Sequence, residues 1–262
     1  MELSDYTKTN LDSWNEVEAR HAKVNKDLFK KVKAADFNNL NPDFESLINS
    51  LEIKGKSVVQ VCCNNGIDLL SVKNKGAGRC LGIDGAEAFI KTAQKLAFAS
   101  DQQNIDFVCS DIYAIPRELE QQFDVVMITV GVINWMPDIA KFMSICASLL
   151  KEGGVMVMEE IHPILGMYEE AGSSYIDASY FDTEPYKSDE GLDYFTHEKY
   201  QASENYWFQH TLDKLLMSAH EANLQLMHIK ELPYNVGNFC ADLEHAENNP
   251  PLGINIAWRH SH

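Results

Sequence analysis

Short apolar runs alternate with segments of helical period between residues 56 and 161. The apolar runs are KSVVQVC, RCLGID, IDFVCSDI, FDVVMITV and GGVMVMEEI, and the segments between them carry apolar residues at a helical spacing. Strands this short, joined by helices, are typical of right-handed βαβ units, in which helices cover both faces of a parallel sheet. The pattern therefore predicts an α/β fold with a doubly wound, Rossmann-like sheet.

The segments on either side of this core have different patterns. The N-terminal segment is polar and helix-prone, whereas a central segment is rich in acidic residues and tyrosine and has no clear period. A run of that length inside a compact domain is usually a functional cover. The last segment predicts one helix, with Thr211 as its N-cap, and two strands. We expect a single domain over 1–262 with four parts: an N-terminal helical cap (1–55), a cofactor-binding core (56–164), a substrate-cover insertion (165–208), and a C-terminal helix and strands that complete the sheet (209–262).

Acidic side chains end two neighbouring strands of the predicted sheet, where such sheets bind ligands. Asp84 lies 18 residues beyond Gly66, close to the spacing at which a carboxylate accepts hydrogen bonds from ribose hydroxyls. Taken alone, Asp84 is equally well explained as the N-cap of a helix that begins near Ala86. Asp111 ends the next strand and is either an adenine contact or a solvated loop acid. Their joint position favours a nucleoside pocket.

The charge and the cysteines limit the classes of partner. The net charge of −17 argues against nucleic acid and against an anionic membrane surface, because both need a basic face. A small neutral or cationic molecule fits better. We expect the six cysteines to be reduced thiols, since they lie mostly in apolar runs without the paired spacing of a zinc site, and we predict no metal. Without an apolar run of membrane length, we expect a cytoplasmic protein.

Five motifs, in this order, make the chain similar to a class I S-adenosylmethionine-dependent methyltransferase. They are VVQVCCNNG, LGIDGAEAFIKTAQKLA, FVCSDIYAIP, FDVVMITVGVINWMPD and LLKEGGVMVMEEIHP. The flanking segments WNEVEARHA, YFDTEP and WFQHTLDKLLMSAHEANLQLMHIKELP resemble a bacterial branch that acts on small molecules. The resemblance implies a seven-stranded sheet, mostly parallel, whose last strand is antiparallel.

The resemblance also implies a set of cofactor-binding residues. In the first motif Gln60 stands where the family has an acid near the methionine amino group, and Cys62, Asn64 and Gly66 stand at its three glycines. Asn64 and Asn65 tolerate the left-handed backbone best among non-glycine residues, so we expect either of them to hold the turn that glycine would otherwise form. We expect Cys62 to need no unusual φ, and Gly66 to let the backbone approach the ligand.

Later motifs supply the other implied contacts. Trp14, on the N-terminal helix, is expected either to close over the cofactor or to be an ordinary core anchor. The resemblance implies further cofactor positions: Asp84, followed by Gly85, matches the acid that contacts the ribose, Asp111 and Ile112 match the adenine contacts, and Thr129 matches the strand end behind the methionine moiety.

The implied activity is methyl transfer from S-adenosylmethionine, with S-adenosylhomocysteine as product, to a small-molecule acceptor. Such transfer depends mainly on proximity and orientation in a closed site. A general base is needed only where the acceptor must lose a proton, and His162 and His210 are the candidates, each with a structural role as the alternative. A binding or regulatory protein that turns nothing over remains the second hypothesis. A nicotinamide dehydrogenase is a distant third, because it requires GxGxxG.

Overall fold

The main sheet lies at the centre of the computed structural model, which describes residues 1–170 and 172–261. In that part of the chain it has seven strands in the order β10-β11-β5-β4-β1-β2-β3. All neighbours pair in parallel except β11, which is antiparallel to both β5 and β10. The predicted fold, with an antiparallel last strand, is therefore confirmed. The strands are β1 (Val58–Val61), β2 (Cys80–Asp84), β3 (Ile105–Cys109), β4 (Phe123–Ile128), β5 (Leu150–Ile161), β10 (Leu224–Leu232) and β11 (Gly253–His260).

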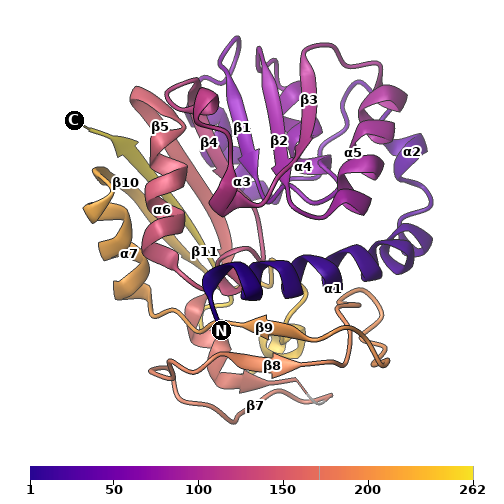
Figure 1. Cartoon of the computed structure of the whole chain (residues 1–262), viewed down its shortest axis with the longest axis vertical. Coiled ribbons are helices and arrows are strands. Elements are labelled where there is room, and N and C mark those ends of the chain that lie inside the picture. Colours follow the sequence, from indigo (N-terminus) through magenta and orange to yellow (C-terminus); the bar gives the residue numbers. More distant parts are fainter. Residues whose placement is uncertain (171, 262) are drawn as a thin grey trace.

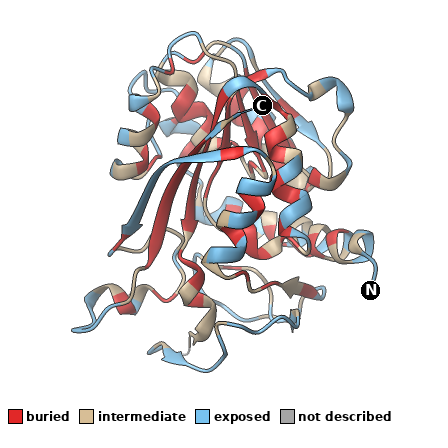
Figure 2. Ribbon diagram, turned by 90° about the vertical axis from the view of Figure 1, so that its left-hand side faces the viewer, coloured by how far each residue is buried: buried red, intermediate tan, exposed pale blue. Residues whose placement is uncertain are grey.

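Helices cover both faces of this sheet (Figure 1). On one face α6 (Ile139–Ser148) and α7 (Leu212–Glu221) pack their buried residues, such as Phe142 and Leu215, against the strands. The other face packs against α3 (Pro42–Ser50), α4 (Ile67–Asn74) and α5 (Glu87–Ser100). Figure 2 shows the central strands almost entirely buried. Burial on both faces explains why the central strands have continuous apolar runs rather than an alternating pattern.

The N-terminal helix α1 (Leu3–Val24) crosses the carboxyl ends of the strands (Figure 1). Its buried residues are spaced three or four apart and form one stripe: Thr7, Asn10, Ser13, Val17 and His21. The Asn10 amide exchanges hydrogen bonds with the backbone of Tyr206, at 2.9 and 2.7 Å. A short helix, α2 (Leu28–Lys31), follows. These contacts fix α1 between the sheet and the central acidic segment.

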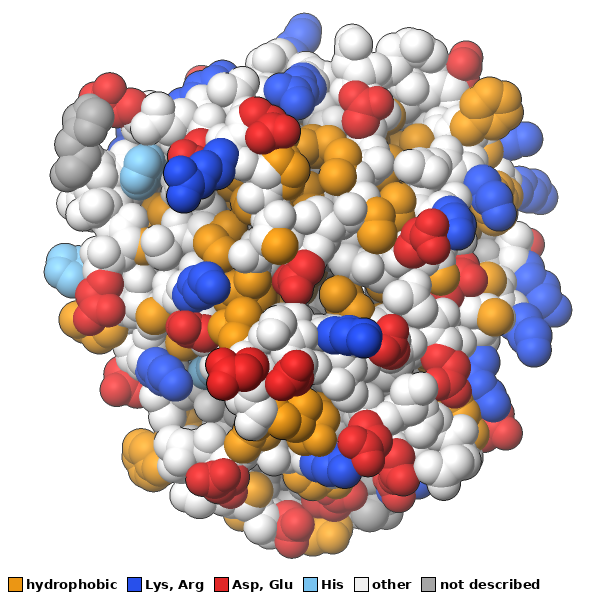
Figure 3. Space-filling model, viewed as in Figure 1, with side chains coloured by type: hydrophobic (Ala, Val, Ile, Leu, Met, Phe, Trp, Pro, Cys, Tyr) orange, Lys and Arg blue, Asp and Glu red, His pale blue; other side chains and the backbone are white. Residues whose placement is uncertain are grey.

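That acidic segment contains two small sheets that the sequence pattern did not predict. Here β6 (Tyr168–Glu169) pairs with β7 (Tyr175–Ile176), and β8 (Tyr186–Ser188) pairs with β9 (Asn205–Trp207), both antiparallel. We refer to the described residues between 165 and 208 as the cover. Acidic side chains are frequent in the lower half of the view in Figure 3, where Figure 1 places α1 and the cover. Short 3₁₀ helices of three to five residues join the elements at Ile112–Ala114, Arg117–Leu119, Ile133–Trp135, Pro163–Met167 and Ala241–His245.

The described residues contain neither a helix suited to a membrane nor a disulfide. None of their helices combines the length and the apolar character that a membrane crossing requires. All six cysteines, from Cys62 to Cys240, are free thiols.

Candidate functional site

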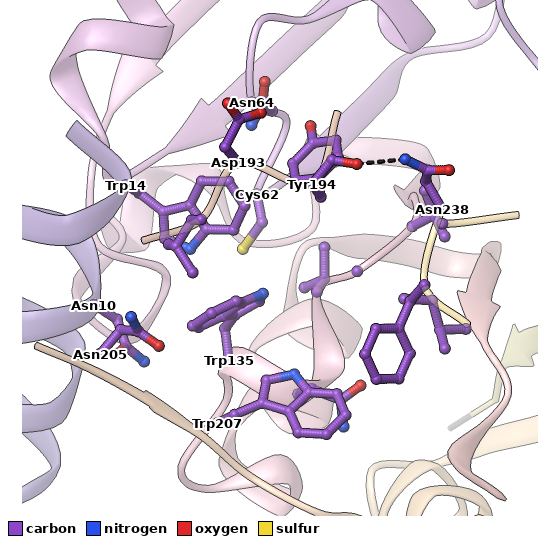
Figure 4. A pocket seen from close by; sticks show the side chains of 18 of the residues that line it. Asn10, Trp14, Cys62, Asn64, Trp135, Asp193, Tyr194, Asn205, Trp207 and Asn238 are labelled. Atoms are coloured by element: carbon purple, nitrogen blue, oxygen red, sulfur yellow. Dashed lines mark hydrogen bonds between the residues drawn. The ribbon is translucent and has the colours of Figure 1, made fainter. Parts of the chain in front are cut away.

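A cavity of about 1260 Å³ lies between the carboxyl ends of the parallel strands, α1 and the cover. Figure 4 shows side chains from all three regions converging on it. Of the ten cofactor-binding residues expected from the sequence, all of which the structure describes, eight line this cavity. They are Trp14, Cys62, Asn64, Asp84, Gly85, Asp111, Ile112 and Thr129. Gln60 and Gly66 are not among the described lining residues.

The loop after β1 contains three residues with left-handed backbone. Cys62 and Asn64 both have φ of 51°, and Gly66 has φ of 74°. Of the two asparagines expected to be able to hold the turn, Asn64 has the left-handed conformation and Asn65 does not. The expectation that Cys62 needs no unusual φ is wrong. The Asn64 side chain supports the turn because its Oδ1 accepts a hydrogen bond from the Asn65 N–H at 2.8 Å.

Gly66 is required by packing inside the protein rather than by the approach of a ligand. A Cβ at this position would overlap the ring of Phe107, a buried side chain of β3, and would also press on Ala93 of α5. Our expectation that Gly66 lets the backbone approach the ligand therefore needs correction. The close contact of Gly66 with Phe107 places the N-terminus of α4 against β3. Because Gly66 also ends the loop after β1, this contact fixes the end of that loop.

The carboxylate of Asp84 joins the loop after β1 to the start of α5. One oxygen accepts from the Asn64 N–H and the other from the Ala86 N–H, both at 2.8 Å. Burial raises the pKa of Asp84, although these hydrogen bonds oppose the rise. A carboxylate has about four acceptor sites, so it can take further donors. The neighbouring Gly85 leaves room for Leu11 of α1, since a Cβ there would meet the Leu11 side chain.

The turn after β3 forms another part of the wall. The Asp111 carboxylate accepts a hydrogen bond from the Tyr113 N–H at 2.9 Å, which caps a single helical turn. Ile112 is buried there and presents an apolar surface to the cavity. The Tyr113 hydroxyl donates to the Asp138 carbonyl at 2.8 Å, and this bond fixes the turn to the N-terminus of α6.

Gln60 lies behind the cavity wall. It is 1 % exposed, and its amide Nε2 donates to the Thr129 hydroxyl oxygen at 2.6 Å. Its Oε1 has no partner among the described residues. Gln60 is therefore connected to the cavity through Thr129, which does line it.

Asp68 lines the same wall, and the sequence analysis missed it. It lies in the first turn of α4, and its Oδ1 accepts from the Asn39 amide at 2.7 Å. Burial raises the pKa of Asp68, against hydrogen bonds from Asn39 and Thr129. The signal available in the sequence was an acid two residues beyond Gly66, at the start of a helix that follows a strand.

Aromatic rings surround the middle of the cavity. In Figure 4, Trp14 of α1 and Trp135, which follows β4, both lie near the Cys62 side chain. The two indole rings pack edge to face with centroids 5.3 Å apart. Tyr194 of the cover lies near Trp14, with ring centroids 6.3 Å apart, and the Asn238 amide donates to its backbone carbonyl. Burial raises the pKa of the Cys62 thiol, so this sulfur is neutral at pH 7.

The sequence of the core matches one known family. Residues 58–154 match the family described as methyltransferase domain. This segment holds β1 to β4, the start of β5 and most of the cavity wall contributed by the sheet. The chain contains a class I S-adenosylmethionine-dependent methyltransferase domain. The cofactor of this family is S-adenosylmethionine.

Individual relatives agree with this assignment. The chain is 29% identical over 127 residues to a ubiquinone biosynthesis O-methyltransferase of Neisseria meningitidis, an alignment that covers 48% of this chain and 52% of the relative. It is 31% identical over 128 residues to a demethylmenaquinone methyltransferase of Lactococcus lactis, with coverage of 47% and 50%. The chain thus spans about half the length of the curated relatives it matches.

The similarity of fold to a solved structure covers more of the chain than residues 58–154. An S-adenosylmethionine-dependent methyltransferase from Mesorhizobium loti superposes with a TM-score of 0.61 at 17% identity. The superposition covers 86% of this chain and 98% of the other.

The two candidate catalytic histidines lie outside the described wall of the methyltransferase cavity. The His162 ring has both nitrogens occupied, by the Ile164 N–H at 3.2 Å and by Glu231 Oε1 at 3.1 Å. His210 is 3 % exposed, and its Nε2 donates to the Met136 carbonyl at 2.8 Å. Burial lowers the pKa of both rings, and that of His210 to about 4. Both rings therefore hydrogen-bond within the protein, and neither is among the described residues that line the cavity.

Acidic side chains dominate the charge around the cavity of the methyltransferase domain. Among the described lining residues there are twelve Asp and Glu but only two Lys, Lys31 and Lys199, and Lys199 is paired with Glu190 at 2.6 Å. Most of the acids belong to the cover. The described residues do not contain three His, Cys, Asp or Glu side chains grouped as metal ligands.

Proposed function

We propose that this protein transfers a methyl group from S-adenosylmethionine to a small-molecule acceptor that is uncharged or cationic. The observation that carries the proposal is the convergence of four strand ends on one cavity. The loop after β1, Asp84, Asp111 and Thr129 all contribute to its wall, and the resemblance in sequence implies a cofactor contact at each of them.

The residues present fit the cofactor. Asp84 would accept hydrogen bonds from the ribose hydroxyls, because its two backbone donors leave acceptor sites free. Ile112 would pack on the adenine ring, with the Asp111 carboxylate at its edge. Trp14, on the α1 side, would cover the cofactor. S-adenosylmethionine supplies a methyl group on a sulfonium, which is already activated for transfer.

The protein's contribution to the reaction is therefore mainly positional. Aromatic rings such as those of Trp14 and Trp135 attract cations and tolerate the sulfonium without competing for the methyl group. The neutral Cys62 thiol is a poor nucleophile, so it does not intercept the methyl group either. Closure by α1 and the cover would exclude water and hold the acceptor in line.

The charge of the wall supports an acceptor without negative charge. Twelve acidic residues of the described lining create a negative potential that repels anions and concentrates cations. The apolar part of the cavity, with Trp135, Trp207 and Phe239, suits a ring or an alkyl group. The quinone methyltransferases among the relatives are consistent with an uncharged ring as acceptor.

Calorimetry and a matched acceptor panel test this function. We expect S-adenosylhomocysteine to bind with a micromolar dissociation constant. With S-adenosylmethionine as donor, we expect turnover of tyramine or an uncharged phenol to exceed that of 4-hydroxyphenylacetate, and the difference to shrink as salt is added. An absence of binding heat and of any thermal shift at saturating ligand would contradict the proposal. Binding without turnover across a broad panel would favour a regulatory protein instead.

A further inference from the structure

One wall of the cavity carries a negative charge that the protein does not neutralise. Asp68 lines the cavity, and its described hydrogen-bond partners, Asn39 and Thr129, are uncharged. No ion pair in the described part of the chain involves Asp68. A partly buried carboxylate without a cation is costly unless a ligand supplies the charge.

Two buried side-chain oxygens near Asp68 have no hydrogen-bond partner in the described structure. Gln60 Oε1 and Glu159 Oε1 have no partner among the described residues, although these side chains are only 1 % and 4 % exposed. The other oxygen of Glu159 accepts from the Asn41 amide at 2.9 Å. Burial raises the pKa of Glu159 to about 7, and the nearby charge of Asp68 contributes to that rise. A ligand group that donates hydrogen bonds and carries positive charge suits these oxygens and the Asp68 carboxylate.

The orientation of Thr129 connects this buried region to the cavity. The Thr129 hydroxyl oxygen accepts a hydrogen bond from Gln60 Nε2, with 2.6 Å between the two atoms. The hydroxyl proton of Thr129 is therefore available for a different acceptor, and Asp68 is the carboxylate nearby. Gln60 thus orients the Thr129 hydroxyl, and Thr129 in turn favours the charged form of Asp68. Gln60 itself is uncharged and lies one side chain away from the cavity.

We infer that Asp68 binds the ammonium group of the methionine moiety of S-adenosylmethionine. It would thereby take over the role of the acid that the family has at the position of Gln60. An ammonium group offers three donors, no acceptor and one positive charge, which is what this wall lacks. Gln60 and Thr129 are positioning residues in this arrangement. The inference rests on the proposed function, because it assigns one end of the same cofactor.

Two ligands that differ only in the amino-acid end test the inference. S-adenosylhomocysteine carries the ammonium group, whereas 5′-methylthioadenosine keeps the nucleoside and lacks the amino-acid part. We expect Asp68→Asn to weaken S-adenosylhomocysteine binding roughly ten- to hundredfold, since a hydrogen bond to a charged group is lost. We expect 5′-methylthioadenosine to bind the variant within about twofold of its affinity for the unchanged protein. Calorimetry measures both dissociation constants.

A second set of variants separates this role from a structural one. Asp68→Ser should show the same selective loss if Asp68→Asn does not fold, and thermal unfolding of each variant checks its folded state. Thr129→Val should lose part of the preference for S-adenosylhomocysteine, while Thr129→Ser should keep it. Equal weakening of both ligands, or no weakening of either, by a folded Asp68 variant would overturn the inference. Failure of the unchanged protein to bind either ligand would instead refute the proposed function.

Discussion

The backbone N–H of Asn64 donates a hydrogen bond to the carboxylate of Asp84, with 2.8 Å between the heavy atoms. This bond joins the loop after β1 to the end of β2, the two strand ends that parallel sheets of this kind use for a nucleoside. The second Asp84 oxygen accepts from the Ala86 N–H at 2.8 Å. Asp84 therefore has a structural role at the start of α5, in addition to the ribose contact that we propose.

Replacing Asp84 should affect both stability and nucleoside binding. Asp84→Ala leaves two backbone donors unpaired, so we expect the free energy of unfolding to fall by about 1 to 3 kcal/mol. We also expect 5′-methylthioadenosine and S-adenosylhomocysteine to bind at least tenfold more weakly. Urea unfolding and calorimetry measure the two effects.

A control variant at another helix start separates these two effects of the Asp84 change. Asp138 caps α6 by accepting from the Lys141 N–H at 2.9 Å, and it is not among the described residues that line the cavity. Asp138→Ala should cost about 1 kcal/mol of stability and leave both affinities unchanged. If Asp84→Ala only destabilised the protein, as Asp138→Ala does, the ribose assignment would be wrong.

Gly66→Ala should be much more destabilising than Gly153→Ala, although both glycines have positive φ. The φ angles are 74° and 70°, but a Cβ at Gly66 would overlap Phe107 while a Cβ at Gly153 has no described atom within 4 Å. We expect a loss of about 1 kcal/mol at Gly153 from backbone conformation. At Gly66 the overlap should add roughly 1 to 3 kcal/mol. Denaturant midpoints of the two variants provide the comparison, and equal losses would show that the Phe107 contact relaxes at little cost.

The strands of the core were predictable because burial on both faces requires continuous apolar runs, which are visible in the sequence. The last two strands, β10 and β11, lie in the C-terminal segment for which the pattern predicted two strands. The short strands of the cover have no such pattern, because a two-residue or three-residue strand on a solvated surface has too few positions to show a period.

The site was predictable only where the chain itself sets the position of a residue. A side chain that ends a parallel strand must lie at the ligand edge, so Asp84 and Asp111 were placed correctly at the cavity. The contact of Gly66 with Phe107 joins residues from distant parts of the chain, which no local pattern reveals. His162 follows β5 directly, yet the direction of its ring depends on its bond to Glu231 on β10.

Two adjacent glutamates of β5 should respond very differently to replacement by glutamine. Glu160 is fully buried and accepts from the Gly131, Val132, Ile133 and Ile161 N–H groups at 2.5 to 3.0 Å. In Glu160→Gln an NH₂ group replaces one acceptor oxygen and faces backbone N–H groups that it cannot accept from. We therefore expect the free energy of unfolding to fall by about 2 to 4 kcal/mol. It should also weaken cofactor binding, because Gly131 and Val132 line the cavity.

The neighbouring residue is the matched control for that change. Glu159 has one unpartnered oxygen within the described structure and one bond from Asn41, and burial raises its pKa to about 7. A neutral glutamine of the same shape should therefore change the free energy of unfolding by less than about 1 kcal/mol. Chemical unfolding at pH 7.5 distinguishes the two variants, and a Glu160→Gln protein as stable as Glu159→Gln would show that the four hydrogen bonds matter little.

His210 should make the protein less stable as the pH falls below 6.5. Burial lowers the pKa of His210 to about 4 from an ordinary value near 6.5, so between these values the unfolded chain binds a proton that the folded protein does not. Stability from this residue is therefore complete above pH 6.5 and is lost progressively toward pH 4. Between pH 7.5 and pH 5 the loss should reach about 2 kcal/mol.

His210→Gln isolates this contribution because glutamine keeps a donor for the Met136 carbonyl but does not titrate. The pKa values of Glu159 and Glu160, both raised to about 7, and the lowered pKa of His21 also make stability depend on pH, but these residues are present in both proteins. The difference between the two proteins in free energy of unfolding, measured in urea at pH 7.5 and at pH 5, therefore reports on His210. Parallel pH profiles would show that His210 is protonated at little cost in the folded state. That result would also return the ring to consideration as a proton acceptor.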